Sequence, residues 1–439
     1  MLGIGGCLLL HACASYEPQP LATKPELVSA VSHISIDASQ LRSPNLARHS
    51  FDPGDGLDMT EVAMLAVANN PDLKAARLTR KLADAQLFKA GLLPDPALAL
   101  SLDHSTNSGP QKLNAFDTDL SYALRDVATR PAALASTQAA RQQVDLELLW
   151  KEWQVAQQAR LLFIRHAALE ARRKPLQQCA KRFADRYAMI MDAIGRGETT
   201  GQQGSVLFTE LFKARQQLND IEQQDLKVRQ QLDALLGLAP KVELKLVGNT
   251  EPLAISDKEV QQRLAGLSER RPDLLALQAV YQSREPRYRK AILGQFPEVT
   301  VGITRARDTD GLYTSGVGIS LSLPFLNRNR GPVAVDKTKR EQLHALYQAR
   351  LVRAYADVGE LSAQRRLLER QYKSQLATLA TLQQRVDNAR KAYDNGDLDG
   401  LAYTTLEVDR LDSDLLRLKL EQSLAELELG LQTLLFCRC

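Results

Sequence analysis

Long apolar runs and a one-sided charge are missing from this chain of 439 residues, and aromatic residues are few. No run of 18 or more apolar residues occurs, so no membrane-spanning helix is expected, although barrel strands would give a much weaker signal. Lys plus Arg (56) nearly balances Asp plus Glu (52), and a net charge of +4 does not favour a nucleic-acid partner. Aromatic residues make up only 5%, whereas Ala, Leu, Gln, Arg and Glu are abundant, which is typical of long helices and coiled coils.

Residues that carry chemistry are also few. The five cysteines form no disulfide framework, the six histidines are dispersed and the five methionines show no clustered spacing. No glycine-rich phosphate loop follows a predicted strand, and no motif suggests a nucleophile beside a base. We therefore expect no metal site, no cofactor and no enzyme activity.

What the sequence does contain is one long internal repeat. A shift of 201 residues places residues 71–73 on 272–274, both Pro-Asp-Leu, and Pro131 on Pro332. Further along, the shift falls to 199, as a two-residue deletion in the second copy would produce. A repeat of this length indicates two copies of one structural unit.

Each copy changes its hydrophobic period from helical to alternating and back. Prolines at first helical positions and glycines after the last turn set the expected boundaries. The predicted organisation begins with a signal peptide at 1–12 and a lipidated strap at 13–57. The first repeat, at 58–237, is expected to contain a short helix at 58–69, a helix from Pro71, a hairpin at about 97–125, a long helix at 131–193 and a return helix at 200–237. A junction at 238–270 leads to the second repeat at 271–436, with a helix from Pro272, a hairpin at about 298–325, a long helix at 332–393 and a return helix at 397–436.

The two long helices carry apolar residues every seven positions, which predicts seams that supercoil around neighbouring helices. In the second seam, Arg365 is the one break. The seam residues are Leu148, Val155, Leu162, Leu169, Leu176, Phe183 and Ile190 in the first copy, and Leu351, Val358, Tyr372, Leu379, Val386 and Tyr393 in the second.

The two hairpins alternate large apolar residues with small or polar ones, so each has one apolar face. Asp103 and Asp119 fall on the opposite face, where they could tune a water-filled bore. Strands can face lipid only in a closed sheet, and bacterial membrane barrels need at least eight strands, so four strands predict an oligomer. Three chains would give twelve strands. The expected lipid-facing residues are Leu98, Leu100, Leu102, Leu120, Tyr122, Leu124, Val299, Val301, Ile303, Val317, Ile319, Leu321 and Leu323.

The N-terminus carries a possible anchor. The run Leu-Leu-Leu-His-Ala-Cys at 8–13 resembles a bacterial lipoprotein cleavage box, although no Lys or Arg precedes the apolar stretch. We expect lipid attachment at Cys13.

Taken in order, several short motifs resemble those of the TolC-type outer-membrane efflux proteins, and the resemblance covers nearly everything from Cys13 onwards. The motifs are Cys-Ala-Ser-Tyr at 13–16, Asn-Pro-Asp-Leu at 70–73, Leu-Pro-Asp-Pro at 93–96, Leu-Ser-Leu-Pro-Phe-Leu at 321–326 and Asn-Gly at 395–396. The resemblance implies a mixed α and β membrane protein: a homotrimer with a twelve-stranded barrel in the outer membrane, continued by a long helical barrel in the periplasm. It also implies a passive exit duct for drugs, small solutes or metal ions, docked to a periplasmic adaptor and an inner-membrane transporter.

The resemblance places a gate and an adaptor-docking surface at the helix turns farthest from the membrane. Family members often carry an arginine two residues past the last glycine and aspartates beyond it, where this chain has Leu398, Ala402 and Thr405. We therefore expect a shifted acidic ring, closed partly by pairs to Arg196 or Arg390; the simpler interpretation is that these are solvated turn residues. The candidate residues are Arg196, Glu198, Asp394, Asp397 and Asp399.

Two other functions fit the same pattern. The duct could carry secreted protein in a type I secretion system, or the chain could be a coiled-coil scaffold without a channel. The presence of a β-sheet would favour either duct over the scaffold.

Overall fold

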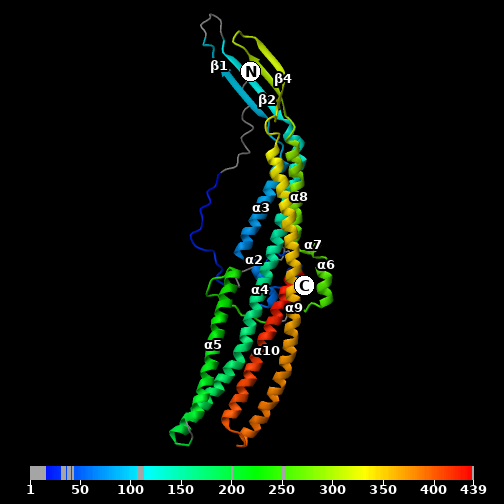
Figure 1. Cartoon of the computed structure of the whole chain (residues 1–439). Coiled ribbons are helices and arrows are strands. Elements are labelled where there is room, and N and C mark those ends of the chain that lie inside the picture. The colour runs from blue at the N-terminus through cyan, green and yellow to red at the C-terminus, as the bar shows by residue number, and fades with distance from the viewer. Residues whose placement is uncertain are drawn as a thin grey trace.

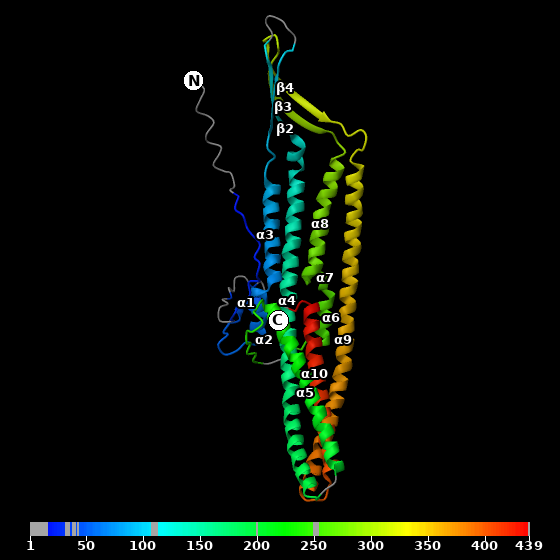
Figure 2. The same cartoon turned by 90° about the vertical axis from the view of Figure 1, so that its left-hand side faces the viewer.

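The computed structural model describes residues 16–30, 36, 41, 44–106, 113–198, 201–248 and 254–437. The molecule is elongated: a β-sheet lies at one end, the turns of two helical hairpins lie at the other, and short helices surround the middle (Figures 1 and 2). The predicted signal peptide and Cys13 lie outside the described residues. None of the described helices combines the length and the apolar composition needed to cross a bilayer.

The sheet contains four antiparallel strands in the order β1 (Ala97–Asp103), β2 (Ala115–Ala123), β3 (Glu298–Arg307) and β4 (Tyr313–Ser322). Each repeat contributes one hairpin, and β2 pairs with β3 to join the repeats, with Tyr122 opposite Val301. The outer strands β1 and β4 each have one neighbour in the sheet. Both edges of the sheet are therefore open within the described part of the chain.

In each repeat, two shorter helices follow one another along one long helix (Figure 1). The side chain of Asn70 joins such a pair end to end, because it donates to the Leu235 carbonyl at 2.8 Å. In the first repeat, α3 (Pro71–Gly91) and α5 (Gly201–Leu236) lie along α4 (Leu124–Gly195); in the second, α8 (Pro272–Leu293) and α10 (Gly400–Leu434) lie along α9 (Arg330–Asp394).

The first long helix begins earlier than predicted. It starts at Leu124 rather than Pro131: the pairing of β2 with β3 ends where Ala123 faces Thr300, and from Leu124 on the backbone groups bond within a helix. Pro131 is tolerated inside α4 at the loss of one amide bond. Pro332, by contrast, lies in the first turn of α9, where an amide is unpaired anyway. At 1.5 Å per residue, the 72 residues of α4 extend about 108 Å.

Most of the first predicted seam forms the core of the first hairpin. Leu162, Leu169 and Phe183 are each at most 3% exposed and belong to one cluster with residues of α5. The break in the second seam has a structural explanation. Arg365 is buried, donates to the Ile255 carbonyl at 2.6 Å and pairs with Glu428 at 3.2 Å and with Asp257.

Short elements surround the middle of the long helices. They are α1 (Pro44–Arg48), α2 (Met59–Asn69), α6 (Asp257–Ala265) and α7 (Leu267–Arg270). Isolated parallel bridges join Val28 to Leu238 and Leu57 to Leu246, so the strap crosses the end of the first hairpin. The helix α2 is buried almost throughout and is closed by a capping box between Asp58 and Glu61.

Candidate functional site

One face of the sheet is apolar over its lower rows. Paired residues in an antiparallel sheet point to the same side. Leu98 therefore shares a row with Leu120, Ile303 and Val317, and Tyr122 shares the next with Val301 and Ile319. Val317 is 81% exposed. The predicted alternation thus produces one continuous apolar surface.

The apolar face differs from the prediction at both ends. Leu124 is the first residue of α4. Leu323 follows β4, because its partner in register would be Pro297, which has no amide hydrogen for strand pairing. Toward the hairpin loops, Arg305 and Arg307 point to the same side as Ile303. The face is therefore apolar near the helices and basic near the hairpin loops.

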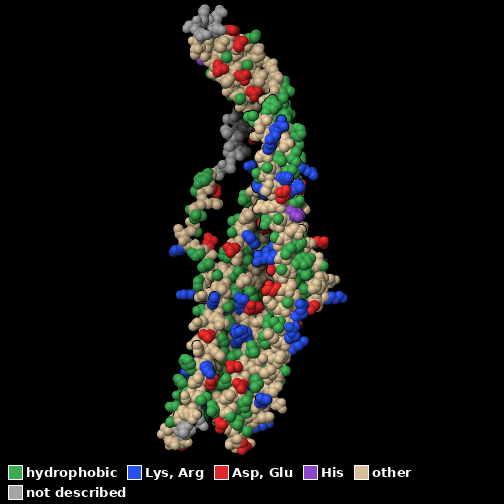
Figure 3. All heavy atoms as spheres, in the orientation of Figure 1, with side chains coloured by type: hydrophobic (Ala, Val, Ile, Leu, Met, Phe, Trp, Pro, Cys, Tyr) green, Lys and Arg blue, Asp and Glu red, His purple; other side chains and the backbone are tan. Residues whose placement is uncertain are grey.

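The opposite face is acidic and otherwise small. Asp119 pairs with Thr304, which in turn pairs with Gly316, so this row leaves space over the sheet. At the base, Glu298 pairs with Arg125 at 3.3 Å. Figure 3 shows acidic side chains gathered over the strands on the side toward the viewer. The carboxylates on this face are Asp103, Asp117, Asp119 and Glu298.

At the far end of the molecule, the two hairpins turn in the same way. Gly197 and Gly396 have φ of +76° and +81°, a left-handed conformation that glycine adopts without strain. In both turns the next amide reaches back to the long helix: Glu198 donates to Ala193 at 3.0 Å and Asp397 to Ala392 at 2.8 Å. This pattern is that of a Schellman cap, which satisfies the last carbonyls of α4 and α9.

The five predicted turn residues have different local roles. Arg196 pairs with Asp192 and with Glu198 inside its own turn, and these hydrogen bonds raise its pKa above the ordinary value. Asp394 lies 3.9 Å from Arg390, with both side chains more than 60% exposed. Asp399 accepts from the Leu401 and Ala402 amides and so caps α10, which explains why this helix begins at Gly400 rather than at the predicted residue 397.

Behind the turns, a buried link that the sequence did not indicate joins the two hairpins. Glu407 of α10 is only 7% exposed and pairs with Arg186 of α4 at 2.5 Å, with Arg182 at 3.8 Å. The Arg186 guanidinium also lies 4.8 Å from the centre of the Tyr403 ring. Tyr403 stacks on Tyr393 with ring centres 5.1 Å apart. We call Arg186, Tyr393, Tyr403 and Glu407 the cross-hairpin link.

The charges of this link support one another. Burial acts to lower the pKa of Arg186, but the hydrogen bond and charge of Glu407 outweigh it, so the pKa rises overall. Burial, together with the Glu407 charge, raises the pKa of Tyr403 and keeps its hydroxyl protonated. The only sequence signal was weak, because Tyr403 and Glu407 stand four residues apart, a spacing common on solvated helices.

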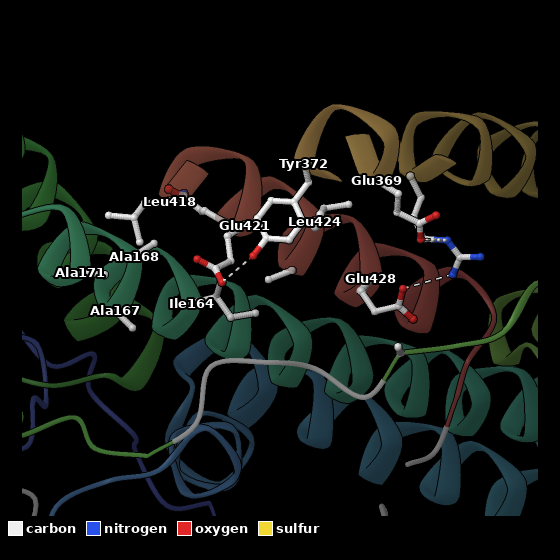
Figure 4. A pocket seen from close by; sticks show the side chains of 14 residues that line it. Ile164, Ala167, Ala168, Ala171, Glu369, Tyr372, Leu418, Glu421, Leu424 and Glu428 are labelled. Atoms are coloured by element: carbon white, nitrogen blue, oxygen red, sulfur yellow. Dashed lines mark hydrogen bonds and ion pairs between the residues drawn. The ribbon is translucent and has the colours of Figure 1, made fainter. Parts of the chain in front are cut away.

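A groove of about 470 Å³ lies between α4, α9 and α10 (Figure 4). Its floor is apolar, with Ile164 and alanines of α4, and its walls carry carboxylates. Glu428 pairs with Arg365 at 3.2 Å, and Glu421 accepts from Tyr372 at 3.3 Å. Because these groups satisfy one another, the groove is a seam of helix packing.

One group of side chains in the described chain has the composition of a metal site. Ligand atoms of His166, Glu170 and Asp225 lie within 4.8 Å of one another. His166 already contacts Asp225 at 2.5 Å, and Arg229 and Arg173 pair with Asp225 and Glu170 at 2.8 and 2.6 Å. The arrangement fits an ion-pair network between α4 and α5. Sequence spacing could not reveal it, because His166 and Asp225 are 59 residues apart.

Comparison with known proteins agrees with this architecture. Residues 265–435 match the sequence profile of the family described as "Outer membrane efflux protein". A comparison with curated protein sequences gave no significant match.

The similar solved structures cover almost the whole chain. CusC has 16% sequence identity and a TM-score of 0.72, with 95% of this chain and 98% of that chain aligned. VceC from Vibrio cholerae has 17% identity and a TM-score of 0.71 over 86% and 95% of the two chains. The CmeC outer membrane channel of Campylobacter jejuni has 17% identity and a TM-score of 0.69 over 95% and 94%. With residues 265–435 matching the family and 86–95% of the chain sharing the fold of these structures, the resemblance to the TolC-type outer-membrane efflux proteins is confirmed.

Proposed function

We propose that this chain forms the outer-membrane channel of a tripartite efflux system, a passive exit duct for drugs, small solutes or metal ions. The observation that carries the proposal is the sheet: one face is mostly apolar, the other is acidic, and both edges are open within the described part of the chain. Such a sheet is stable in lipid only as a sector of a closed barrel. The long helices then continue the wall away from the membrane.

A homotrimer closes the barrel with twelve strands, when β4 of one copy pairs with β1 of the next. The helices support the same arrangement, because each flank of one chain exposes large apolar side chains. Leu82 of α3 is 58% exposed and Phe212 of α5 is 61% exposed, while on the other flank Val352 of α9 is 66% exposed. Three copies would bury these flanks against one another.

In this channel the acidic face lines the bore. Twelve strands leave a water-filled interior, whereas eight are generally filled by side chains. The carboxylates would attract cations and repel anions over the distance that salt screening allows, about 8 Å at physiological ionic strength. Glycines on this face have no side chains that project into the bore. The duct therefore conducts solutes without binding any one of them.

The hairpin turns form the opposite opening. We infer that Arg196, Glu198, Asp394 and Asp397 meet the periplasmic adaptor, because they are exposed at the extreme end of the molecule. Asp399 acts there through its helix cap. The cross-hairpin link would hold the two hairpins of one chain together, so that opening requires the Arg186–Glu407 pair to separate.

Two further parts of the proposal concern the surroundings. We infer that Cys13 carries the lipid anchor and that an inner-membrane transporter completes the pump. A type I secretion duct would have the same barrel and would differ from an efflux channel in its cargo, which is secreted protein. A scaffold without a channel does not account for a four-stranded sheet with an apolar face.

Reconstitution tests the proposal directly. The detergent-extracted protein should have the mass of three chains, appear as tubes longer than about 100 Å by negative-stain microscopy, and conduct ions in a planar bilayer. A compact monomer, or a trimer that never conducts, would contradict the proposed function.

A further inference from the structure

The apolar face of the sheet carries two arginines where a barrel in lipid should have none. Arg305 and Arg307 stand two residues apart on β3, on the side occupied by Ile303. Their Cα atoms are therefore about 6.6 Å apart along one strand. Arg305 is exposed and has no hydrogen-bond or ion-pair partner among the described residues.

Aromatic rings surround the second arginine. The Arg307 guanidinium lies 5.4 Å from the centre of the Phe116 ring and 5.9 Å from that of Tyr313. The two rings meet edge to face at 6.1 Å. The Arg307 Nη2 atom donates to the Asn114 carbonyl at 2.7 Å and Nε is buried, which leaves the remaining Nη hydrogens for another acceptor. The rings orient the guanidinium in a fixed position.

The height of the pair fits the membrane boundary. From Val299 to Arg307, the strand extends about 26 Å, which at a tilt of about 40° corresponds to about 20 Å along the membrane normal. Leu323 and Phe325, 50% and 73% exposed, continue the apolar surface below the sheet. Together they approach the apolar band of about 25 Å that such barrels present to lipid. The arginines thus lie at its outer edge, beside aromatic rings of the kind that mark interfaces.

We propose that Arg305 and Arg307 form a binding site for the phosphate group of an anionic lipid on the outer surface of the barrel. A guanidinium donates two parallel hydrogen bonds to phosphate oxygens, and two arginines on one face can hold one phosphate group. The inference rests on the proposed function, because it needs the apolar face to lie in a membrane. The site fixes the height of the barrel in the outer leaflet.

The test uses the full-length protein in its assembled form. It is placed in nanodiscs of phosphatidylcholine with or without one quarter of phosphatidylglycerol, and the lipids retained after detergent transfer are counted by native mass spectrometry. The attraction of two basic residues to an anionic surface corresponds to a preference of about thirtyfold for phosphatidylglycerol over phosphatidylcholine. Wild type should retain phosphatidylglycerol with that preference, and R305Q/R307Q should lose it.

Three controls separate the explanations. The R305K/R307K variant keeps the charge and should recover part of the preference, whereas Arg390→Gln, at the opposite end of the molecule, should change nothing. Inorganic phosphate at millimolar concentration should not displace the lipid; displacement would overturn the lipid assignment in favour of free phosphate. Equal lipid retention by wild type and R305Q/R307Q, with both still trimeric and conducting, would overturn the inference alone. A wild-type protein that is not trimeric, or that does not conduct, would overturn the proposed function.

Discussion

Replacing Glu407 by glutamine should loosen the far end of the channel without altering its shape. Glu407 is 7% exposed and neutralises Arg186, which is 20% exposed. Removing one partner of a buried pair costs about 3–5 kcal/mol, because the remaining charge is left without compensation. Since Arg186 retains some solvent contact and stacks on Tyr403, we expect the lower end, about 3 kcal/mol.

Hydrogen exchange of the assembled protein measures that change locally. A loss of about 3 kcal/mol should speed exchange of the amides in the first turns of α10 more than about a hundredfold, because 1.4 kcal/mol is a factor of ten. Single-channel conductance in a planar bilayer should rise in parallel, if the link restrains the opening. Arg186→Gln should act in the same direction, and combining both changes should cost less than their sum.

The matched control is the exposed pair in the adjacent turn. Arg390 and Asp394 are 71% and 63% exposed and 3.9 Å apart. Arg390→Gln should therefore change exchange by less than about 0.5 kcal/mol. If Glu407→Gln leaves exchange in α10 and conductance at their wild-type values, the cross-hairpin link does not hold the hairpins together.

Three further changes test other parts of the molecule. Gly237→Ala should destabilise the junction of α5 and α3 by about 1–2 kcal/mol, because φ is +64° and the new Cβ would lie 3.1 Å from the Asn69 carbonyl oxygen; Gly359→Ala, in an open helical position, should instead stabilise by up to about 1 kcal/mol, and thermal unfolding compares the two. Replacing Asp117 and Asp119 by asparagine should lower the cation preference of the pore, seen as a shift of the reversal potential toward zero in a salt gradient; an unchanged potential would place these carboxylates outside the bore. Burial raises the pKa of the Asp233 carboxyl above its ordinary 3.8, so protonation favours the folded state. Asp233→Asn should therefore be more stable than wild type at neutral pH, and this advantage should disappear as the pH falls through the raised pKa toward 3.8; an advantage independent of pH would refute the assignment.

The elements of this fold could be predicted because local physics determines them. Alternation in residues 97–103 matches β1, and the proline at position 71 begins α3 at the predicted residue. The predicted start residues of helices were wrong where strand pairing or a helix cap determined them. The helix α4 extends back to Leu124, directly after the last residue of β2 that pairs with β3, and α10 begins only after the Asp399 cap.

The apolar seams and the alternating strands could be predicted from the sequence alone, since they follow from periods of seven and two residues, and the repeated unit follows from the shift of 201 residues. Which charges pair with one another became visible only in the folded chain. Glu407 and Arg186 are 221 residues apart, and Arg365, a break in the seam, finds its partners 63 and 108 residues away. Periodicity records which face a residue occupies, but ion pairs between hairpins depend on how those faces are brought together, which no local pattern contains.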